Sequence, residues 1–273
     1  MFVWRKRASA RWLAANEGDL RRIAGDQLAV IETGSGKTAT AEVADDDRQR
    51  LERVRRRFGG RIATLPRYWL SNFSRLSAKR SLRIGKRLRI VRRRTHLQGF
   101  PALIIPAGAA FGTGDHATTA MSLNLLERIS RTLAPGWSLI DLGTGTGVLA
   151  LAAKRFGAEK VCAIDLDPTA ISTAKENARL NKILGIEFRV SDVRTVTAAQ
   201  KFDIVSANLF SDLLIEISPR VARMLKGGGF AILSGILHNQ ERDLRRGFRG
   251  LPLRLLDIRR RGKWITLLTQ KPI

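Results

Sequence analysis

The chain has 273 residues, 44% of them hydrophobic, and it carries 49 Lys and Arg against 24 Asp and Glu, a formal net charge of +25. This length and hydrophobic content predict a folded protein of two domains, and the single cysteine excludes an intramolecular disulfide and fits a reducing compartment. The longest uncharged stretch, residues 97–114, is interrupted by prolines and glycines, and no apolar segment follows the basic N-terminus, so we expect a cytoplasmic protein without a signal peptide or membrane span.

The positive charge is concentrated in the first part of the chain. Residues 1–100 hold 25 Lys and Arg against 9 Asp and Glu, a net charge of +16, and the remaining residues contribute +9. Runs such as residues 53–57 and 92–94 form an electrostatic footprint suited to RNA or to a ribosome-associated partner. A solvated basic face explains the same runs equally well, because charge runs carry little specificity. Both interpretations stay open.

The first 65 residues alternate between strand and helix patterns. The patterns predict strands at residues 2–7, 27–32, 37–43 and 61–65 and helices at residues 9–23 and 45–58. Between the second and third strands, T-G-S-G has the composition of a hairpin turn. The order β-α-β-β-α-β predicts a small α+β domain of ferredoxin-like type over residues 1–65.

A connecting region over residues 66–100 follows, with one predicted strand at residues 87–91. Next, the glycine-rich loop at residues 111–119 leads into a predicted amphipathic helix at residues 120–129. Thr118 and Thr119 stand at the start of this helix, where threonines are ordinary N-terminal caps.

A strand, a glycine turn and a helix are predicted at residues 137–153. The apolar run at residues 137–142 leads directly to Gly143, Gly145 and Gly147, whose lack of a Cβ permits unusual φ values and close approach of a ligand. The spacing is G-x-G-x-G, and Val148 stands where a dinucleotide fingerprint has its third glycine. The pattern resembles motif I of class I S-adenosylmethionine-dependent methyltransferases, in which the acidic residue two before the first glycine, here Asp141, belongs to the cofactor site. A glycine turn without a ligand is the alternative.

The next strand, residues 160–165, ends in a carboxylate 22 residues after Gly143. At the tip of a second strand, Asp165 is placed to accept two short, charge-assisted hydrogen bonds from a ribose diol. Asp167 precedes Pro168 and is therefore predicted to be a helix N-cap with proline at the first helical position, not a ligand residue.

The remaining strands complete a predicted seven-stranded sheet. They lie at residues 186–190, 202–207, 230–233, 253–260 and 264–269, with the last two forming an antiparallel hairpin and a turn predicted at Gly227, Gly228 and Gly229. Asp192 follows the third strand, where it is either an acceptor for the adenine amino group or a helix cap. The closing hairpin is typical of methyltransferases and foreign to a dinucleotide-binding fold.

Asn208 lies just past the fourth strand, beside the point where ligands bind in open α/β sheets. Methyl transfer from a sulfonium requires mainly alignment and an unprotonated amine. The side-chain carbonyl of Asn208 and the backbone carbonyl of Leu209 can each accept an N–H from the acceptor and direct its lone pair at the methyl group. The segment resembles the N-P-P-[FY] corner of amine and adenine methyltransferases, with Leu209 in place of the first proline. This departure weakens the inference to a base-modifying enzyme.

Four motifs together resemble one family. The motifs are F-G-T-G-D-H-A-T-T at 111–119, D-L-G-T-G-T-G at 141–147, A-I-D-L-D-P-T-A at 163–170 and A-N-L-F at 207–210. In order and spacing they resemble those of the bacterial methyltransferases of large-subunit ribosomal protein eleven. The resemblance is strong over residues 82–271 and weak before Tyr68. It implies a ferredoxin-like substrate-recognition domain at 1–65, a linker at 66–100 and a Rossmann-like class I methyltransferase domain at 101–273.

The same resemblance implies S-adenosylmethionine as cofactor and assigns residues to it. Thr119 is implied as a cofactor contact, beside Asp141, Gly143, Gly145, Asp165, Asp192 and Asn208, and Asn208 and Leu209 are the expected catalytic pair. His116 is either a ligand-side residue or, as we favour, a residue that stabilises the loop. No metal is expected.

We therefore predict a protein N-methyltransferase that modifies amino groups, on lysine side chains or an N-terminal amine, of a large-subunit ribosomal protein. Two alternatives follow from the basic charge. One is an RNA methyltransferase, and the other is a catalytically silent protein that binds ribosomes or RNA.

Overall fold

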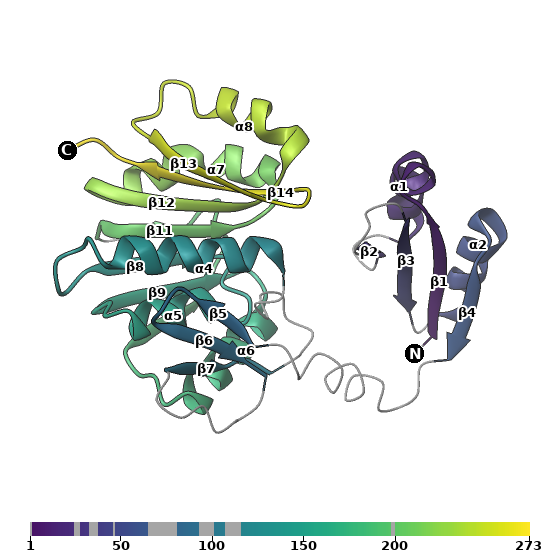
Figure 1. Cartoon of the computed structure of the whole chain (residues 1–273), viewed down its shortest axis with the longest axis horizontal. Helices are drawn as coiled ribbons and strands as arrows, with labels where there is room; N and C mark the ends of the chain where they lie inside the picture. The colour runs from purple at the N-terminus through teal and green to yellow at the C-terminus, as the bar shows by residue number, and fades with distance from the viewer. Residues whose placement is uncertain are drawn as a thin grey trace. The chain divides into compact units, whose positions relative to one another are not determined.

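The structure is a computed structural model that describes residues 2–24, 28–32, 38–45, 47–64, 81–92, 101–106, 116–197 and 200–273. The chain divides into two compact units, Met1–Phe73 and Ser74–Ile273 (Figure 1). The predicted hairpin turn at residues 33–36 and most of the glycine-rich loop before His116 lie outside the described residues.

The smaller unit is a four-stranded antiparallel sheet with two helices. Its elements are β1 (Phe2–Ser9), α1 (Ala10–Ala24), β2 (Leu28–Glu32), β3 (Thr38–Asp45), α2 (Arg48–Phe58) and β4 (Arg61–Thr64), and the strand order is β2-β3-β1-β4. Trp4 and Val43 from the sheet pack with Leu20 and Leu51 from the helices in one apolar core. The predicted ferredoxin-like arrangement is confirmed, because the β-α-β-β-α-β order closes into this antiparallel sheet.

The larger unit contains the seven-stranded sheet that the sequence predicts, with strand order β10-β9-β8-β11-β12-β14-β13. Its strands are β8 (Ser138–Leu142), β9 (Lys160–Asp165), β10 (Ile186–Val190), β11 (Phe202–Asn208), β12 (Leu225–Leu237), β13 (Arg254–Arg261) and β14 (Trp264–Gln270). β8 to β12 are parallel, and β14 runs antiparallel to both of its neighbours. The Rossmann-like class I methyltransferase fold is confirmed.

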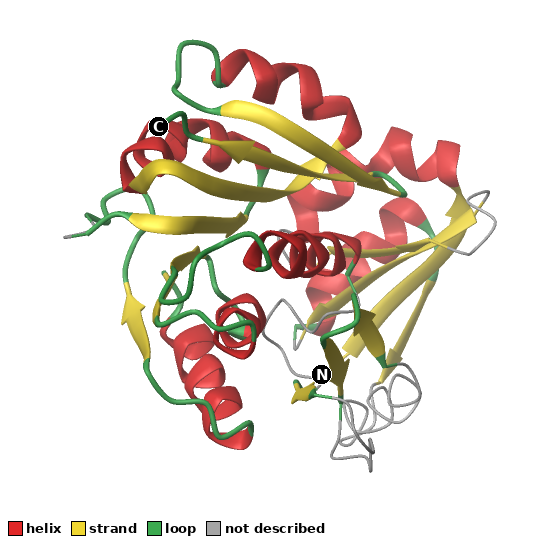
Figure 2. Cartoon of the chain, turned by 60° about the vertical axis from the view of Figure 1, so that its left-hand side comes forward, coloured by secondary structure: helices red, strands yellow, loops and turns green. Residues whose placement is uncertain are grey.

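Helices cover both faces of this sheet (Figure 2). One face is covered by α4 (Ala117–Ser130), α5 (Val148–Arg155) and α6 (Pro168–Leu180), and the other by α7 (Ser211–Met224) and α8 (Glu241–Gly247). Adjacent strand residues alternate between the two apolar clusters, so that Leu139 packs with α4 and α5 whereas Ile140 packs with α7. Parallel strands buried on both faces explain why the strand sequences are continuous apolar runs.

One predicted turn is part of a strand. Gly227, Gly228 and Gly229 lie within β12, where the pairing with β11 is irregular between Phe202 and Ile204. Gly228 N–H donates to Lys271 O and Lys271 N–H donates to Gly229 O, so the C-terminal segment pairs with these glycines. The prediction of a free turn was wrong because hydrogen bonds from a distant segment extend the strand.

A short sheet packs on the larger unit; its middle strand confirms the strand predicted at residues 87–91, whereas its two outer strands were not predicted. It consists of β5 (Leu82–Ile84), β6 (Leu88–Val91) and β7 (Ala102–Ile104), and Ile84, Leu88 and Leu103 join the same core cluster as α4 and α5. Residues 81–92 therefore belong structurally with the larger unit. The domain boundary predicted at residue 101 remains a prediction.

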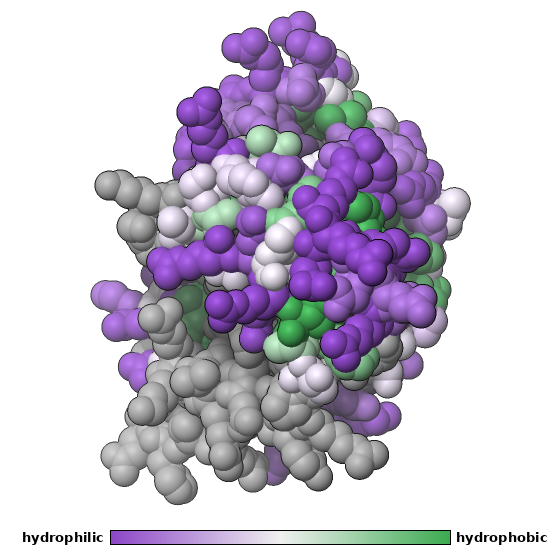
Figure 3. Space-filling view, turned by 90° about the vertical axis from the view of Figure 1, so that its right-hand side faces the viewer, coloured by the Kyte–Doolittle hydropathy of each residue, from purple (hydrophilic) through white to green (hydrophobic). Residues whose placement is uncertain are grey.

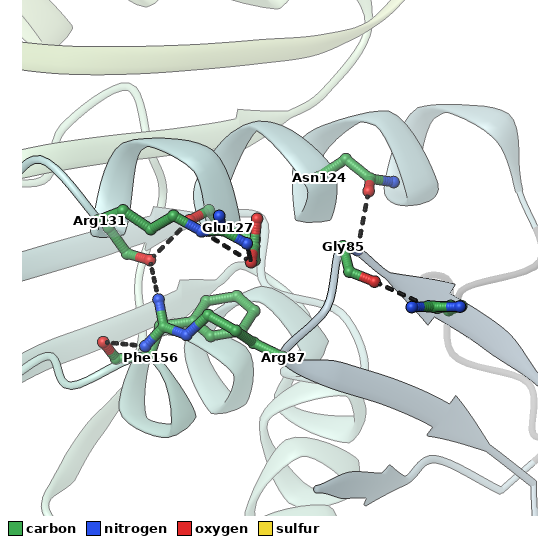
Figure 4. Close-up of polar contacts among 8 residues, drawn as sticks. Gly85, Arg87, Asn124, Glu127, Arg131 and Phe156 are labelled. Carbon is green, nitrogen blue, oxygen red and sulfur yellow. Dashed lines mark hydrogen bonds and ion pairs between the residues drawn. The ribbon is translucent and has the colours of Figure 1, made fainter. Parts of the chain in front are cut away.

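Arg87 fastens the β5–β6 hairpin to α4 and α5. It donates to Ser130 Oγ and to the carbonyl oxygen of Phe156, and its guanidinium lies 5.0 Å from the centroid of the Phe156 ring (Figure 4). In the hairpin turn, Gly85 N–H donates to Asn124 Oδ1 (Figure 4). A Cβ on Gly85 would lie 2.7 Å from the carboxylate of Glu127, so glycine is required where the turn meets α4.

This packing explains why α4 is not the amphipathic helix that the sequence predicts. The helix begins three residues earlier than predicted, at Ala117, and nearly all its side chains are buried between the large sheet and the β5–β6 hairpin, with Asn124 and Arg128 as the exposed ones. In Figure 3, which faces the side of the smaller unit, the coloured surface is mostly purple, that is hydrophilic, with small green patches. Among the described helices, none has the length and apolar character needed to cross a membrane.

Candidate active site

The residues predicted for the site meet at the carboxyl ends of the parallel strands. β8 lies between β9 and β11. The strands that directly follow β8 in the sequence, β9 and β10, lie on one side of it in the sheet, and the later strands, from β11 on, lie on the other side. Open α/β sheets bind ligands at this switch point, because the loops diverge there and leave a crevice. Asp141, Asp165 and Asn208 stand at or next to the ends of these three strands.

The glycine loop after β8 is tightly folded. Gly143, Gly145 and Gly147 have φ values of +73°, +54° and +79°, which non-glycine residues rarely adopt. The N–H groups of Gly143 and Thr144 both donate to the carbonyl oxygen of Ile164 on β9, at 2.9 Å. Gly147 precedes α5 and lies against Ala174 of α6, where a Cβ would come within 2.9 Å of the alanine side chain.

Asp141 is a buried carboxylate beneath this loop. Thr144 Oγ1 donates to one of its oxygens at 2.7 Å and Ser206 Oγ donates to the other at 2.6 Å. Burial raises the pKa of Asp141 to about 6, although these two hydrogen bonds act in the opposite direction. The carboxylate thus ties the glycine loop to β11 and supplies negative charge near neutral pH.

Asp165 contacts the same loop from the end of β9. Its Oδ2 accepts a hydrogen bond from Gly145 N–H at 2.8 Å, and its Oδ1 accepts one from Asp167 N–H at 3.1 Å. Each carboxylate oxygen can accept further hydrogen bonds. Asp167 is the N-cap of α6, as predicted: it accepts from Thr169 N–H, with Pro168 at the first helical position.

Asn208 is the last residue of β11 and pairs with Ser234 of β12. Its Oδ1 atom is buried and has no hydrogen-bond partner among the described residues. A buried carbonyl oxygen without a partner is costly, which marks it as a position where a ligand supplies the donor. The next residue, Leu209, donates its N–H to Ser234 O at 3.0 Å, and its side chain covers Gly143.

The N-terminus of α4 reaches this edge of the sheet. Ser234 Oγ lies 3.5 Å from Thr118 O and 2.6 Å from Thr266 Oγ1, which links α4 to the ends of β12 and β14. Thr119 Oγ1 is buried without a hydrogen-bond partner in the described part of the chain. Ser234 pairs with Asn208 and contacts the residue before Thr119, so it connects the two residues whose side-chain oxygens have no partner among the described residues.

The two threonines do not cap α4, contrary to the sequence-based expectation. The N-cap is His116, and Thr118 and Thr119 lie inside the first turn, because the helix begins at Ala117. His116 Nδ1 is 2.7 Å from Thr118 Oγ1, and its ring packs edge-on against Trp264 with centroids 4.9 Å apart. Burial, followed by the charge of Lys263, lowers the pKa of His116. These contacts favour the loop-stabilising interpretation of His116.

Asp192 follows β10 and begins a turn instead of a helix. Its Oδ1 accepts from Arg194 N–H at 2.8 Å, and its carbonyl oxygen accepts from Val196 N–H at 2.9 Å. The residues that follow are not helical in the structure, so the helix-cap alternative was wrong. A contact with an adenine amino group remains a prediction.

With this geometry in place, the comparisons with known proteins decide the family. A model of the ribosomal protein L11 methyltransferase family (PrmA) matches residues 71–272. The chain belongs to this family.

Individual relatives agree with the PrmA assignment. A ribosomal protein L11 methyltransferase of Pelobacter propionicus is 36% identical over 211 residues, which cover 74% of this chain and 65% of the relative. One of Symbiobacterium thermophilum is 38% identical over 200 residues, which cover 71% of this chain and 63% of that relative. The chain thus spans slightly less than two thirds of these curated relatives. A crystal structure of ribosomal protein L11 methylase from Lactobacillus delbrueckii subsp. bulgaricus superposes with a TM-score of 0.64 at 27% identity, covering 71% of this chain and 99% of that one.

Several residues at the site of this PrmA family member were not predicted from the sequence. Ser206 and Thr144 hold Asp141, and Trp264 holds His116, but hydroxyl and aromatic residues within strands and loops give no distinguishing pattern. Phe210, which belongs to the A-N-L-F motif already identified, is 79% exposed directly after Leu209.

Proposed function

We propose that the protein is an S-adenosylmethionine-dependent protein N-methyltransferase that acts on amino groups of a large-subunit ribosomal protein. The observation that carries the proposal is the Oδ1 of Asn208 at the switch point of the sheet, which is buried and has no hydrogen-bond partner in the described part of the chain. The names of the relatives, which are ribosomal protein L11 methyltransferases, supply the substrate class. A ribosomal substrate is consistent with a cytoplasmic enzyme.

The residues at the sheet edge fit this cofactor. Asp165 offers carboxylate oxygens to a ribose diol, and the glycine loop beside it exposes backbone without side chains. The buried Oγ1 of Thr119, which has no partner among the residues that the structure describes, offers a hydrogen bond to the amino acid portion or ribose. Asp141, once ionised, provides negative charge toward a positively charged ligand. Asp192 completes the proposed cofactor set with Gly143, Gly145 and Asn208.

When bound, the cofactor supplies a methyl group on a positively charged sulfur, which is a good leaving group, so the protein's task is alignment. The Oδ1 of Asn208 accepts one N–H of the acceptor amine and thereby directs its lone pair. The carbonyl of Leu209 is the second acceptor; it lies against Gly235, where a Cβ would collide with it, so glycine keeps this carbonyl free of a covering side chain. The proton of the amine is released to solvent.

The experiment uses the purified full-length protein, radiolabelled cofactor, a large-subunit ribosomal protein L11 and ribosomal RNA. We expect label in the protein fraction, on lysine side chains or on the N-terminal amine, and loss of this label in Asn208→Ala. Label in the RNA fraction alone would instead identify an RNA methyltransferase. Absence of cofactor binding in calorimetry would leave a catalytically silent binding protein.

We propose further that the smaller unit recognises the acceptor. The support is its ferredoxin-like fold and its position before the methyltransferase unit, as the family resemblance implies. Deletion of residues 1–65 should abolish labelling of the ribosomal protein while cofactor affinity is retained. Unchanged labelling after the deletion would assign recognition to the larger unit.

A further inference from the structure

The methyl-transfer site leaves the large positive charge of this protein unexplained. Between Glu52 and Asp115 the sequence has no acidic residue and 16 Lys and Arg, and over the whole chain 37 of the 49 basic residues are arginine. Arginine presents a planar fork that pairs with phosphate through two hydrogen bonds, whereas lysine acts as a point charge. This composition favours a phosphate-containing partner over a merely solvated face.

Residues 81–92 of the acid-free segment lie along one side of α4. In the β5–β6 hairpin, Arg83 and Lys86 are exposed, and the turn between them is fixed to the helix because Gly85 N–H donates to Asn124 Oδ1 at 3.3 Å. Arg87 anchors the same hairpin through Ser130 and Phe156, so these exposed cations stand on a hairpin that is bonded to α4 and to the end of α5 (Figure 4).

A pocket lies on the other side of Asn124. It has a volume of about 430 Å³ and is lined by Asn124, three further residues of α4 and three consecutive arginines of the edge strand β13, Arg259, Arg260 and Arg261. Asn124 lines this pocket and also contacts the β5–β6 turn. The surface around Asn124 thus carries exposed cations from two segments far apart in the sequence.

The acidic residues of this surface are already paired. Asp257 accepts from Arg128 at 2.7 Å and from Arg259 at 3.1 Å, so one carboxylate is shared by two guanidinium groups. Arg260 pairs with Glu241 at 2.8 Å. Arg261 has no ion pair or hydrogen bond of its side chain with any residue that the structure describes. The pocket therefore has excess positive charge and a guanidinium able to bind an anion.

We propose that this surface, from Arg83 and Lys86 across Asn124 to Arg259 and Arg261, binds the phosphates of an RNA strand. A linear series of phosphates matches cations placed on both sides of one helix, and phosphate contacts of this type bind RNA without reading its sequence. The surface uses none of Asp141, Asp165 or Asn208. RNA binding and the proposed methyl transfer can therefore be lost independently.

The test measures binding of a fluorescently labelled 20-nucleotide single-stranded RNA of mixed sequence to the full-length protein by anisotropy at several salt concentrations. The variant Arg259→Gln/Arg261→Gln should bind at least tenfold more weakly at low salt, and its salt slope should be smaller by about 1.4, the value for two lost contacts with a single strand. The control is Arg254→Gln/Arg242→Gln, which removes the same charge from exposed positions at the start of β13 and on α8. The RNA affinity of this control variant should stay within about threefold of that of the wild type, which is the scale of a general charge effect.

A second variant tests the other end of the surface. Arg83→Gln/Lys86→Gln should weaken RNA binding in the same way. If the β13 variant fails to fold, this variant still tests whether the surface binds RNA. Equal loss in the test and control variants, or no loss in either, would overturn the proposal. Binding of poly-glutamate as tight as that of RNA would also overturn it, because the surface would then fit an acidic polypeptide.

Discussion

Leu209 covers the first glycine of the cofactor loop. A Cβ added to Gly143 would lie 2.5 Å from Leu209 Cδ2, whereas a Cβ on Gly250, which has a similar φ of +77°, would contact nothing within 4 Å. Leu209 is joined to Asn208, so the glycine loop and the proposed catalytic corner constrain each other.

Gly143→Ala should therefore impair catalysis as well as stability. The left-handed backbone costs about 1–2 kcal/mol in either alanine variant. In Gly143→Ala the displaced Leu209 adds a further cost of about 1–3 kcal/mol, the range for overpacking, and shifts Asn208. Chemical denaturation and turnover measurements on Gly143→Ala and Gly250→Ala check this. Equal turnover in the two variants would show that Leu209 moves without consequence for the site.

Asn208→Ala should lower kcat about 10- to 100-fold, because a hydrogen bond that aligns the acceptor contributes about 1.5–3 kcal/mol in the transition state. Cofactor affinity should change only a few-fold. Asn239→Ala is the control, since Asn239 is exposed just after the neighbouring strand β12 and has no assigned role. Single-turnover kinetics and calorimetry measure the two quantities separately. Normal turnover in Asn208→Ala would remove the residue from the mechanism.

Asp165→Ala should weaken cofactor binding by about 1.5–3 kcal/mol, the range for hydrogen bonds to a charged group. Asp167→Ala is the matched control two residues later. It removes the N-cap of α6 and should lower the thermal midpoint, but it should leave cofactor affinity unchanged. Isothermal titration with both variants distinguishes a ligand contact from a general effect on this loop. If both lose affinity equally, the ribose assignment of Asp165 is wrong.

Asp141 should give the protein a specific pH dependence. Burial raises its folded-state pKa to about 6 from 3.8, so the folded state binds this proton more tightly than the unfolded state does. Its contribution to stability is present below about pH 4 and is lost as the pH rises through about 6. Asp141→Asn resembles the protonated form. It should gain stability relative to the wild type between pH 4 and 7, by on the order of 3 kcal/mol.

Asp203 provides a control with the opposite sign. Burial acts to raise its pKa, but the hydrogen bonds from Lys226 and Ser138 outweigh this and hold the pKa of Asp203 below its ordinary value. Its contribution is present above the unfolded-state pKa and is lost as the pH falls through the lower folded-state value. Urea titrations should show that Asp141→Asn gains stability relative to the wild type as the pH rises from 4 to 7, and that the deficit of Asp203→Asn, constant above about pH 4, shrinks as the pH falls below 4. Parallel trends would mean that Asp141 is not protonated as described.

The sequence by itself determined those features that depend on contacts close along the chain. The β8 strand, the glycine turn and α5 follow from an apolar run, three glycines and helix-forming residues. Asp167 caps α6 because its carboxylate reaches the N–H two residues later. The parallel strands were readable because burial on both faces requires continuous apolar runs. The family resemblance, carried by four short motifs, rests on the same local information.

Only the tertiary structure decided how distant segments meet. Thr119 and Asn208 are 89 positions apart in the sequence, and the register of β11 with β12 and the bond of Ser234 to α4 bring their unpaired oxygens to one edge. α4 is buried on almost all sides because the β5–β6 hairpin covers it, and Gly227 to Gly229 extend a strand because Lys271 pairs with them. Burial and long-range pairing depend on which surfaces the whole fold places together, and no local pattern encodes that.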